Sequence, residues 1–149
     1  MIGRFVLPAP LRAKLEQEAK RAFPRECCGL IEGIIETGIS GLSNDESDCV
    51  ARATALHPAP NLAAAPDRFE IDPVAHFALL RGLRGTHRAI IGCYHSHPNG
   101  RAEPSPRDIS GAAETGFLWL IVALESAEAP IHLACFAWTG FAFAKVRMI

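Results

Sequence analysis

Neither acidic nor basic residues are in large excess in this sequence. The chain has 15 lysines and arginines against 16 aspartates and glutamates, a formal net charge of −1, and it contains no lysine- or arginine-rich run. Proteins that bind nucleic acid usually present a basic patch to the phosphates. The composition therefore argues against nucleic acid as the main partner.

Long hydrophobic runs are also missing. No apolar run approaches the roughly 20 residues that a helix needs to cross a bilayer. Arg4, Arg12 and Lys14 interrupt the N-terminal stretch, which lacks the apolar core of a signal peptide. We therefore expect a cytoplasmic protein with no membrane partner.

The cysteines do not follow a disulfide pattern. There are five, which is an odd number, two of them are adjacent, and no Cys-x-x-Cys pair occurs. Such usage is typical of a reducing compartment. The five residues are Cys27, Cys28, Cys49, Cys93 and Cys135.

Several common catalytic motifs are absent as well. The sequence has no His-Glu-x-x-His, no glycine-rich phosphate-binding loop and no Gly-x-Ser-x-Gly. These absences argue against the common zincins, nucleotide-binding proteins and serine hydrolases. Zinc-dependent nucleobase deaminases generally use a Pro-Cys-x-x-Cys pattern. That pattern is missing too, so a deaminase of small molecules is a disfavoured alternative.

Short apolar runs that alternate with amphipathic segments predict an α/β fold, a mixed sheet flanked by helices. No internal repeat or linker occurs, so we expect one domain of residues 1–149. The predicted strands are 27–35, 50–56, 68–72, 88–97 and 117–124, then a hairpin of 131–138 and 141–148. The predicted helices lie between Pro10 and Pro24, at 73–83 and from 105 to about 116, and segments 38–48 and 57–66 are predicted as turn or loop. The side chains expected to face the core are Leu11, Leu15 and Ala19 in the first helix and Phe77, Leu80 and Leu83 in the second.

The most informative stretch is Tyr94-His95-Ser96-His97-Pro98, at the end of an apolar, β-branched run. Side chains alternate between the two faces of a strand, so His95 and His97 point the same way. Their Cα atoms would lie roughly 6.6 Å apart. That spacing lets two imidazoles converge on one metal ion. Pro98 cannot donate to a sheet ladder and should end the strand.

A carboxylate follows in the segment Ser105-Pro106-Arg107-Asp108. This segment resembles a helix start, with Ser105 as the N-cap, Pro106 at the first helical position and Asp108 at the third. If Asp108 returns to the two histidines, the three side chains form a plausible catalytic zinc set with one coordination position free. The alternative is an ordinary capping box, which would explain Ser105 and Asp108 without any metal.

A catalytic zinc site also needs a group that accepts a proton from water. Glu26 is the strongest candidate, because it stands where a charged residue meets the buried run that begins at Cys27. Partial desolvation there would raise its pKa and suit it to acid/base chemistry. The alternative is a solvated residue between helix and strand. The other acidic candidates are Glu32, Glu70, Asp72, Glu103 and Glu114.

Taken together, these segments resemble the JAMM (MPN-plus) metalloprotease family, and its small stand-alone bacterial members in particular. The family signature is a glutamate, then His-x-His-Pro, six or seven residues, and Ser-x-x-Asp. This chain has Pro24-Arg25-Glu26-Cys27-Cys28-Gly29-Leu30, then His95-Ser96-His97-Pro98, six residues, and Ser105-Pro106-Arg107-Asp108. Asn61 and the segment from Phe69 to Pro73 also resemble bacterial members. The resemblance implies a cytidine-deaminase-like mixed sheet.

The resemblance also implies roles for individual residues. His95, His97 and Asp108 would ligate zinc, with a water molecule in the fourth position. Glu26 would be the general acid/base that activates this water, and Ser105 would help to stabilise the developing oxyanion.

For the substrate, the resemblance implies the C-terminal Gly-Gly tail of a ubiquitin-like sulfur-carrier protein, cut at a peptide or isopeptide bond. The tail is expected to dock along a sheet edge. Segments 57–66 and 125–130 are short, which argues against the ubiquitin-gripping insertions of eukaryotic members. One alternative is a non-catalytic module of this fold that only binds a ubiquitin-like partner. Another is a thiol hydrolase that uses Cys27, Cys28 or Cys93 with His95.

Overall fold

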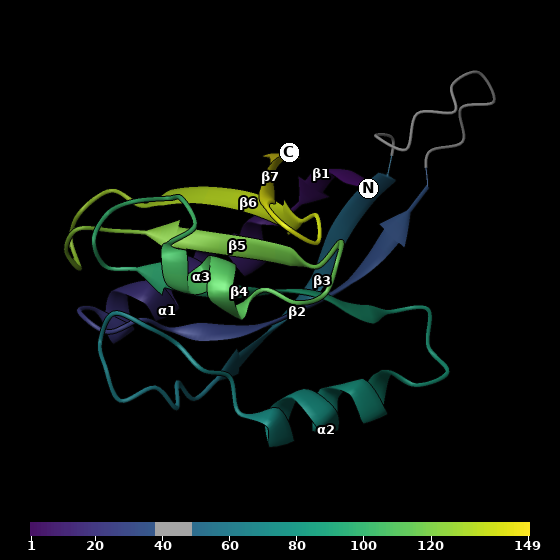
Figure 1. Ribbon diagram of the computed structural model, residues 1–149, viewed down its shortest axis with the longest axis horizontal. Helices are drawn as coiled ribbons and strands as arrows, with labels where there is room; N and C mark the ends of the chain where they lie inside the picture. Colours follow the sequence, from purple (N-terminus) through teal and green to yellow (C-terminus); the bar gives the residue numbers. More distant parts are fainter. Residues whose placement is uncertain (38–48) are drawn as a thin grey trace.

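The structure, a computed structural model, describes residues 1–37 and 49–149, so the polar segment predicted at 38–48 lies outside the described residues. The helices are α1 (Ala9–Ala22), α2 (Pro73–Leu83) and α3 (Pro106–Gly111). The strands are β1 (Ile2–Val6), β2 (Cys28–Glu36), β3 (Cys49–Ala59), β4 (Ala89–His97), β5 (Leu118–Ala123), β6 (His132–Trp138) and β7 (Phe143–Met148). Figure 1 shows their arrangement. None of the helices in the described part is long and apolar enough to cross a bilayer.

The strands form one mixed sheet that closes on itself in the order β1-β3-β2-β4-β5-β6-β7. β4 and β5 are parallel, whereas β2 is antiparallel to both β3 and β4. β1 was not predicted, and it closes the sheet by pairing in parallel with β3 and β7. The mixed sheet flanked by helices is confirmed, and it places β4 between β2 and β5, at the centre of the strand order.

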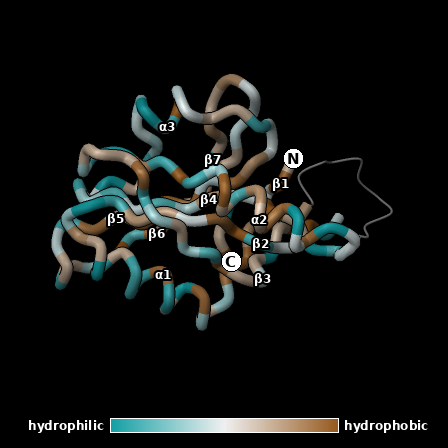
Figure 2. The backbone as a smooth tube through the Cα atoms, turned by 90° about the horizontal axis from the view of Figure 1, so that it is seen from below, coloured by the Kyte–Doolittle hydropathy of each residue, from teal (hydrophilic) through white to brown (hydrophobic). Residues whose placement is uncertain are grey.

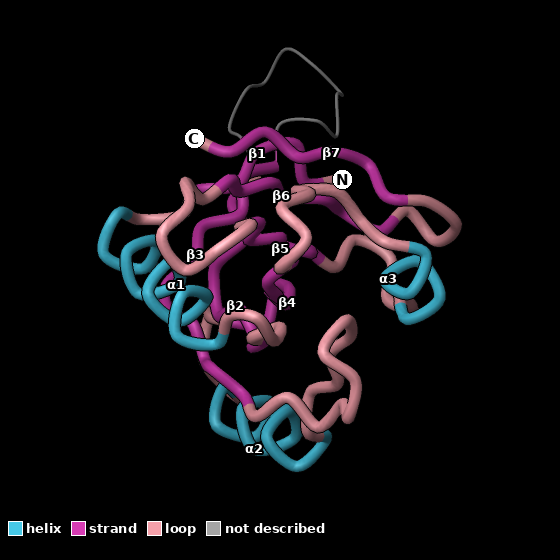
Figure 3. The backbone as a smooth tube through the Cα atoms, turned by 90° about the vertical axis from the view of Figure 1, so that its left-hand side faces the viewer, coloured by secondary structure: helices cyan, strands magenta, loops and turns pink. Residues whose placement is uncertain are grey.

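The main core lies between the sheet and α1, as the sequence predicts. Leu15 and Ala19 of α1 are fully buried, and Leu11 packs at the edge of the same cluster. Hydrophilic and hydrophobic residues alternate along α1 in Figure 2, as expected for a helix with one buried side. α1 and α3 lie on opposite sides of the sheet (Figure 3). The candidate site is therefore built on the side away from this core.

The expectation for the apolar face of α2 is wrong. Phe77 and Leu80 were expected to face inward, but they are 64% and 45% exposed, and Val74 is 73% exposed. The half-buried Leu79 is the α2 residue that packs against a second small cluster with Leu30, Cys93 and Trp119. The helical pattern identified an apolar face, but the sheet covers a different side of the helix.

Three element boundaries also differ from the prediction. Residues 68–72 form no strand, and only a single bridge joins Ile71 to Asn61. β3 continues through His57 and two further residues because β2 pairs with it along that length. α3 ends at Gly111 rather than near residue 116, since Ala112 already has an extended backbone. The longer β3 comes from pairing between distant segments, which local patterns do not report.

Candidate functional site

Two histidine rings meet at the carboxyl end of β4. His95 and His97 point to the same side of the strand, and their Nε2 atoms lie 2.8 Å apart. His95 is fully buried and His97 is 6% exposed. β4 is flanked by β2 and β5, which pair with His95 through Cys28 and Ile121. The strand is therefore held from both sides at the point where the rings converge.

Asp108 of α3 joins the two rings. Its Oδ1 atom lies 3.1 Å from His95 Nε2, and its Oδ2 atom lies 3.2 Å from His97 Nε2. The N–H of Ser105 donates to Asp108 Oδ2 at 2.7 Å, and the N–H of Asp108 donates to Ser105 Oγ at 3.2 Å. The capping box and the approach to the histidines, which the sequence left as alternatives, therefore occur together. The cap holds the carboxylate in place.

The spacing of these donor atoms fits zinc. Four-coordinate zinc with bonds of about 2.0–2.1 Å separates its ligand atoms by roughly 3.3 Å, close to the 2.8, 3.1 and 3.2 Å found here. His97 Nδ1 lies 2.9 Å from the carbonyl oxygen of Arg101, and donation to it leaves the Nε2 lone pair free for an ion. Within the described part, His95 Nδ1 has no hydrogen-bond partner. The residues fit the metal, and their role as ligands stays a prediction.

Burial and close contact shift the pKa values of the cluster. Burial lowers the pKa of His95 more than its contact with Asp108 raises it. Burial would also lower the pKa of His97, but Asp108 and the Arg101 carbonyl outweigh it and raise this pKa. For Asp108, burial acts to raise the pKa, yet the hydrogen bonds with both histidines hold it well below its usual range. Asp108 is thus kept in the ionised form that a metal ligand requires.

Glu26 lies beside the cluster, just before β2. One oxygen of Glu26 and one nitrogen of each histidine all lie within 4.8 Å of one another. Glu26 is only 6% exposed, which rules out the solvated alternative. Burial, the largest cause, raises its pKa from 4.5 to about 7, and His97 acts in the opposite direction. Proximity alone would make Glu26 a ligand as well, but the direct contacts of Asp108 with both rings favour Asp108 for that role.

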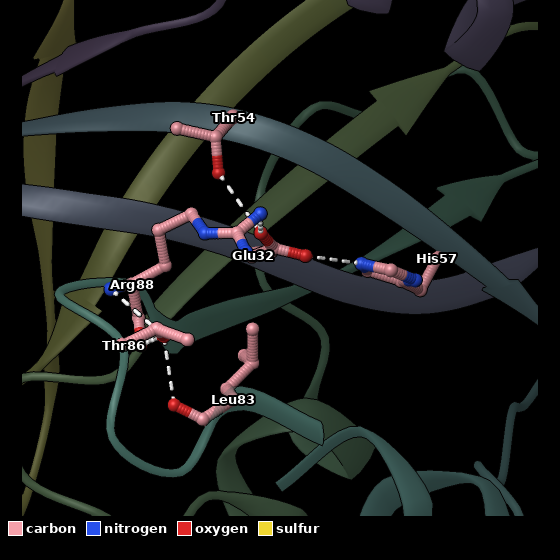
Figure 4. Close-up of polar contacts among 6 residues, drawn as sticks. All are labelled: Glu32, Thr54, His57, Leu83, Thr86 and Arg88. Atoms are coloured by element: carbon pink, nitrogen blue, oxygen red, sulfur yellow. Dashed lines mark hydrogen bonds and ion pairs between the residues drawn. The ribbon is translucent and has the colours of Figure 1, made fainter.

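The other acidic candidates lie outside the histidine cluster, although Glu70 lines the cavity beside it. Glu32 is buried, but Arg88 donates to its Oε1 atom at 2.6 Å and His57 Nε2 lies 2.7 Å from its Oε2 atom (Figure 4). Asp72 caps α2 by accepting the N–H of Val74. The remaining three are exposed, namely Glu70, Glu103 and Glu114. Of the six candidates, all of them in the described residues, Glu26 is the one that stands beside the histidines.

A cavity of about 250 Å³ opens next to Glu26 and Asp108. It lies between the segment before α2 and the segment of α3, and its lining combines charged and apolar side chains. The charged ones include Asp67, Arg68 and Arg107, and the apolar ones include Leu30, Phe69, Phe117 and Trp119. A cavity with an apolar lining and a few charged groups beside reactive side chains is typical of a substrate site.

Two residues that the sequence did not assign to the site support it. The ring of Phe69 stacks on His95, with centroids 4.3 Å apart and planes 22° apart. Ser96 Oγ accepts the N–H of Cys27 at 2.8 Å, and both residues are buried. The Ser96 side chain therefore connects Cys27, the residue after Glu26, to the strand that carries the two histidines. Its place in the middle of His-x-His was the available signal, since its side chain must point away from the site.

The cysteines are poorly suited to nucleophilic chemistry. All five are free, which agrees with the expectation that none forms a disulfide. Burial raises the pKa of Cys27 to about 11 and that of Cys28 to about 12, and it raises that of Cys93 well above its usual value. A nucleophilic cysteine needs a lowered pKa to supply thiolate. The thiol-hydrolase alternative therefore has no support in the geometry.

A comparison of sequences identifies the family. The sequence model of Prok-JAB, described as prokaryotic homologs of the JAB domain, matches residues 8–138. The chain belongs to the Prok-JAB family. This finding confirms the resemblance inferred from Glu26, the His-x-His-Pro segment and the Ser-x-x-Asp segment.

Two curated relatives of this Prok-JAB chain have named activities. Desampylase of Haloferax volcanii is 29% identical over 151 residues, which cover 98% of this chain and 96% of the relative. A probable TtuB-protein conjugate cleaving protease of Thermus thermophilus is 41% identical over 106 residues, which cover 71% of this chain and 62% of the relative. This chain is similar to both, and the first similarity extends over nearly the full length of each protein.

Solved structures share the fold of this Prok-JAB chain. A protein from Desulfitobacterium hafniense matches with a TM-score of 0.77 at 23% identity, over 100% of this chain and 92% of the other. A JAB1/MPN domain protein from Archaeoglobus fulgidus matches with a TM-score of 0.53 at 18% identity, over 98% and 96% of the two chains. The mixed α/β fold is thus that of JAB/MPN domain proteins.

Proposed function

We propose that the protein is a zinc-dependent peptidase or isopeptidase that cleaves at the C-terminal Gly-Gly tail of a ubiquitin-like sulfur-carrier protein. The observation that carries the proposal is the convergence of His95, His97 and Asp108 within 3.2 Å, next to the buried Glu26. The names of the two relatives, a desampylase and a conjugate-cleaving protease, support hydrolysis of protein conjugates.

In the proposed site, the Nε2 atoms of His95 and His97 and the carboxylate of Asp108 hold the zinc ion. When bound, zinc lowers the pKa of a coordinated water toward about 7 and polarises the carbonyl group of the substrate. The adjoining cavity is proposed to receive the chain on either side of the scissile bond.

Glu26 has the position of the general acid/base. It is buried beside the histidines, and this burial raises its pKa to about 7 in the metal-free protein, which favours proton uptake by the carboxylate. It accepts the proton as water attacks and then donates it to the leaving nitrogen. The hydroxyl of Ser105 lines the same cavity and is proposed to donate to the developing oxyanion. In the resting state this hydroxyl oxygen accepts the N–H of Asp108, which leaves its own hydrogen free to donate.

Metal content tests the ligand set. Protein purified without chelator and supplied with zinc should hold about one equivalent, and Glu26→Gln should hold the same amount. Asp108→Ala should lose it, because two imidazoles alone leave a zinc set incomplete. Asp67→Ala is the matched control, since Asp67 is another carboxylate of the cavity lining but no part of the cluster. Loss of zinc in Glu26→Gln rather than in Asp108→Ala would reverse the roles of the two carboxylates.

Cleavage assays test the reaction. The probes are a ubiquitin-like sulfur carrier with a peptide extension after its Gly-Gly, the same carrier linked to a lysine side chain, and an unrelated peptide. We expect cleavage directly after Gly-Gly, read by mass spectrometry, with loss of activity in Glu26→Gln and on chelation. Cleavage of the unrelated peptide alone would refute the substrate assignment. Zinc binding without any cleavage would favour the alternative, a module that binds a ubiquitin-like partner.

A further inference from the structure

Asn61 stands just after β3 and uses the full hydrogen-bonding capacity of its side chain. Its Nδ2 atom donates to the carbonyl oxygens of Glu26 and Arg68, both at 3.0 Å. Its Oδ1 atom accepts the N–H of Ala63 at 2.9 Å and that of Glu70 at 3.0 Å. An amide has two donor hydrogens and two acceptor lone pairs, so these four bonds satisfy it completely.

The bond to Glu26 joins two parts of the candidate site that are far apart in the sequence, and the other three bonds lie within the second part. The first part is the backbone of Glu26. The other is the segment 61–71, which forms no strand and is held to itself by one bridge and by the N–H of Leu62, which donates to the carbonyl of Glu70. Phe69 of this segment stacks on His95, and its neighbours line the cavity. The Asn61 side chain therefore links the backbone of the proposed acid/base to the cavity wall, and the bond from Arg25 to the carbonyl of Ala64, at 3.5 Å, is a second link.

The backbone around Glu26 is anchored on its other side as well. The N–H of Cys27 donates to Ser96 Oγ between the two histidines. The Ser96 bond sets Glu26 relative to the histidine strand, and the Asn61 bond sets it relative to the cavity wall. An error of about 1 Å in the placement of a catalytic group can cost roughly 100-fold in rate.

We propose that Asn61 is a positioning residue, which fixes the backbone of Glu26 and the Phe69 wall as one unit. The inference rests on the proposed hydrolase function and extends it to a residue that is neither a proposed metal ligand nor the proposed acid/base. The amide is required because its Nδ2 atom serves both Glu26 and Arg68 of the wall, while its Oδ1 atom serves the wall alone. A side chain that keeps the acceptor and loses the donor removes the bond to Glu26 and keeps two of the three bonds within the wall.

Asn61→Asp makes that separation. A carboxylate still accepts the N–H groups of Ala63 and Glu70, but it cannot donate to the carbonyls of Glu26 and Arg68. We expect kcat on the extended sulfur carrier to fall by about 10- to 100-fold, with KM and zinc content close to wild type because two of the three bonds within the wall are kept. Asn61→Ser loses the bonds of both side-chain atoms, so kcat should fall and KM should rise. If the new carboxylate prevents folding, Asn61→Ser alone carries the test of kcat.

Asp72→Ala is the matched control. It removes one side-chain-to-backbone bond of 2.9 Å next to the same segment, at the cap of α2, with no link to Glu26. Its stability should drop while kcat and KM stay near wild type. An equal fall of kcat in Asp72→Ala would overturn the proposal, because any loss of a bond near this segment would then lower kcat. Wild-type kcat in folded Asn61→Asp and Asn61→Ser would also overturn it, because the side chain would then have no effect on the reaction.

A measurement on the resting protein keeps this inference separate from the proposed function. If the wild-type protein cleaves none of the probes, the proposed function fails, and the side-chain carboxyl ¹³C resonance of Glu26 then decides the role of Asn61. That resonance should move in Asn61→Asp and stay in place in Asp72→Ala. An unchanged resonance in Asn61→Asp would show that Asn61 does not position Glu26.

Discussion

Glu26 is a buried carboxylate whose negative charge opposes folding of the metal-free protein. Burial raises its pKa from 4.5 to about 7, so the folded state holds the proton to a higher pH than the unfolded chain does. Stability from this group is therefore complete below about pH 4.5 and is lost as pH rises through 7. Such a cost is common where a group is placed for chemistry rather than for stability.

Glu26→Gln should remove this dependence on pH. With a chelator present, the variant should gain roughly 2–3 kcal/mol of unfolding free energy over wild type between pH 5 and pH 8. Urea unfolding at both pH values measures the difference. Glu103→Gln, an exposed glutamate beside Arg101, is the control and should show a constant difference. A constant difference for Glu26→Gln would contradict the raised pKa.

At the scale of single residues, the sequence predicted which side chains come together in the cluster, but not the side chains that support them. His95, His97, Ser105 and Asp108 belong to two short local patterns, a strand end and a helix cap, and both occur where expected. Ser96 and Phe69 act through partners 69 and 26 residues away, Cys27 and His95. No local pattern reports such contacts, so the partners of these two residues became visible only in the fold.

At the scale of elements, close packing of β2 leaves no room for a side chain at Gly29. A Cβ atom on Gly29 would lie 2.4 Å from the ring of Tyr94 and 2.5 Å from the backbone oxygen of His57 in β3. Gly29→Ala should therefore cost about 1–3 kcal/mol of unfolding free energy, measured by urea unfolding. Gly82→Ala in α2 is the control, because nothing lies within 4 Å of its added Cβ and alanine favours a helix by about 0.5–1 kcal/mol. Equal stability of the two variants would contradict the close approach.

The exposed side of α2 gives a prediction about protein substrates. Phe77 and Leu80 are largely exposed, and the neighbouring residue His76 lines the cavity. If a ubiquitin-like protein rests on this side while its tail enters the cavity, Phe77→Ser with Leu80→Ser should raise KM for the protein substrate by about 5- to 30-fold. KM for a short Gly-Gly peptide should not change, since a peptide held in the cavity does not need the exposed side chains of Phe77 and Leu80.

The control for this double variant is Phe141→Ser, because Phe141 is 84% exposed in the turn between β6 and β7. It should leave both KM values unchanged. A rise of KM for the short peptide as well would mean that the α2 variant had disturbed the cavity itself. The inward orientation first predicted for Phe77 would have made the double variant a core mutation, with a large loss of stability instead.

At the scale of the whole molecule, the sequence predicted which elements exist better than how they associate. Apolar runs identified β2, β4 and β5 because strands covered on both faces are apolar along their length. β1 is five residues long and includes Arg4, and its place between β3 and β7 depends on segments at opposite ends of the chain. A single domain of residues 1–149 stays a prediction.

Zinc should stabilise the whole fold, since the proposed ligands come from β4 and α3 and meet only in the folded chain. Zinc at 100 times its dissociation constant would add about 2.7 kcal/mol, which for a chain of this length corresponds to roughly 5–10 °C in Tm. Differential scanning calorimetry with zinc and with chelator measures the shift. Asp108→Ala should show little of this shift in Tm.

Acidification should also abolish the shift in Tm, because metal ligands must be deprotonated and protons displace zinc from imidazole in the range near pH 6.5. An equal shift in Asp108→Ala, or one that persists at pH 5, would place the stabilising zinc outside the cluster of His95, His97 and Asp108.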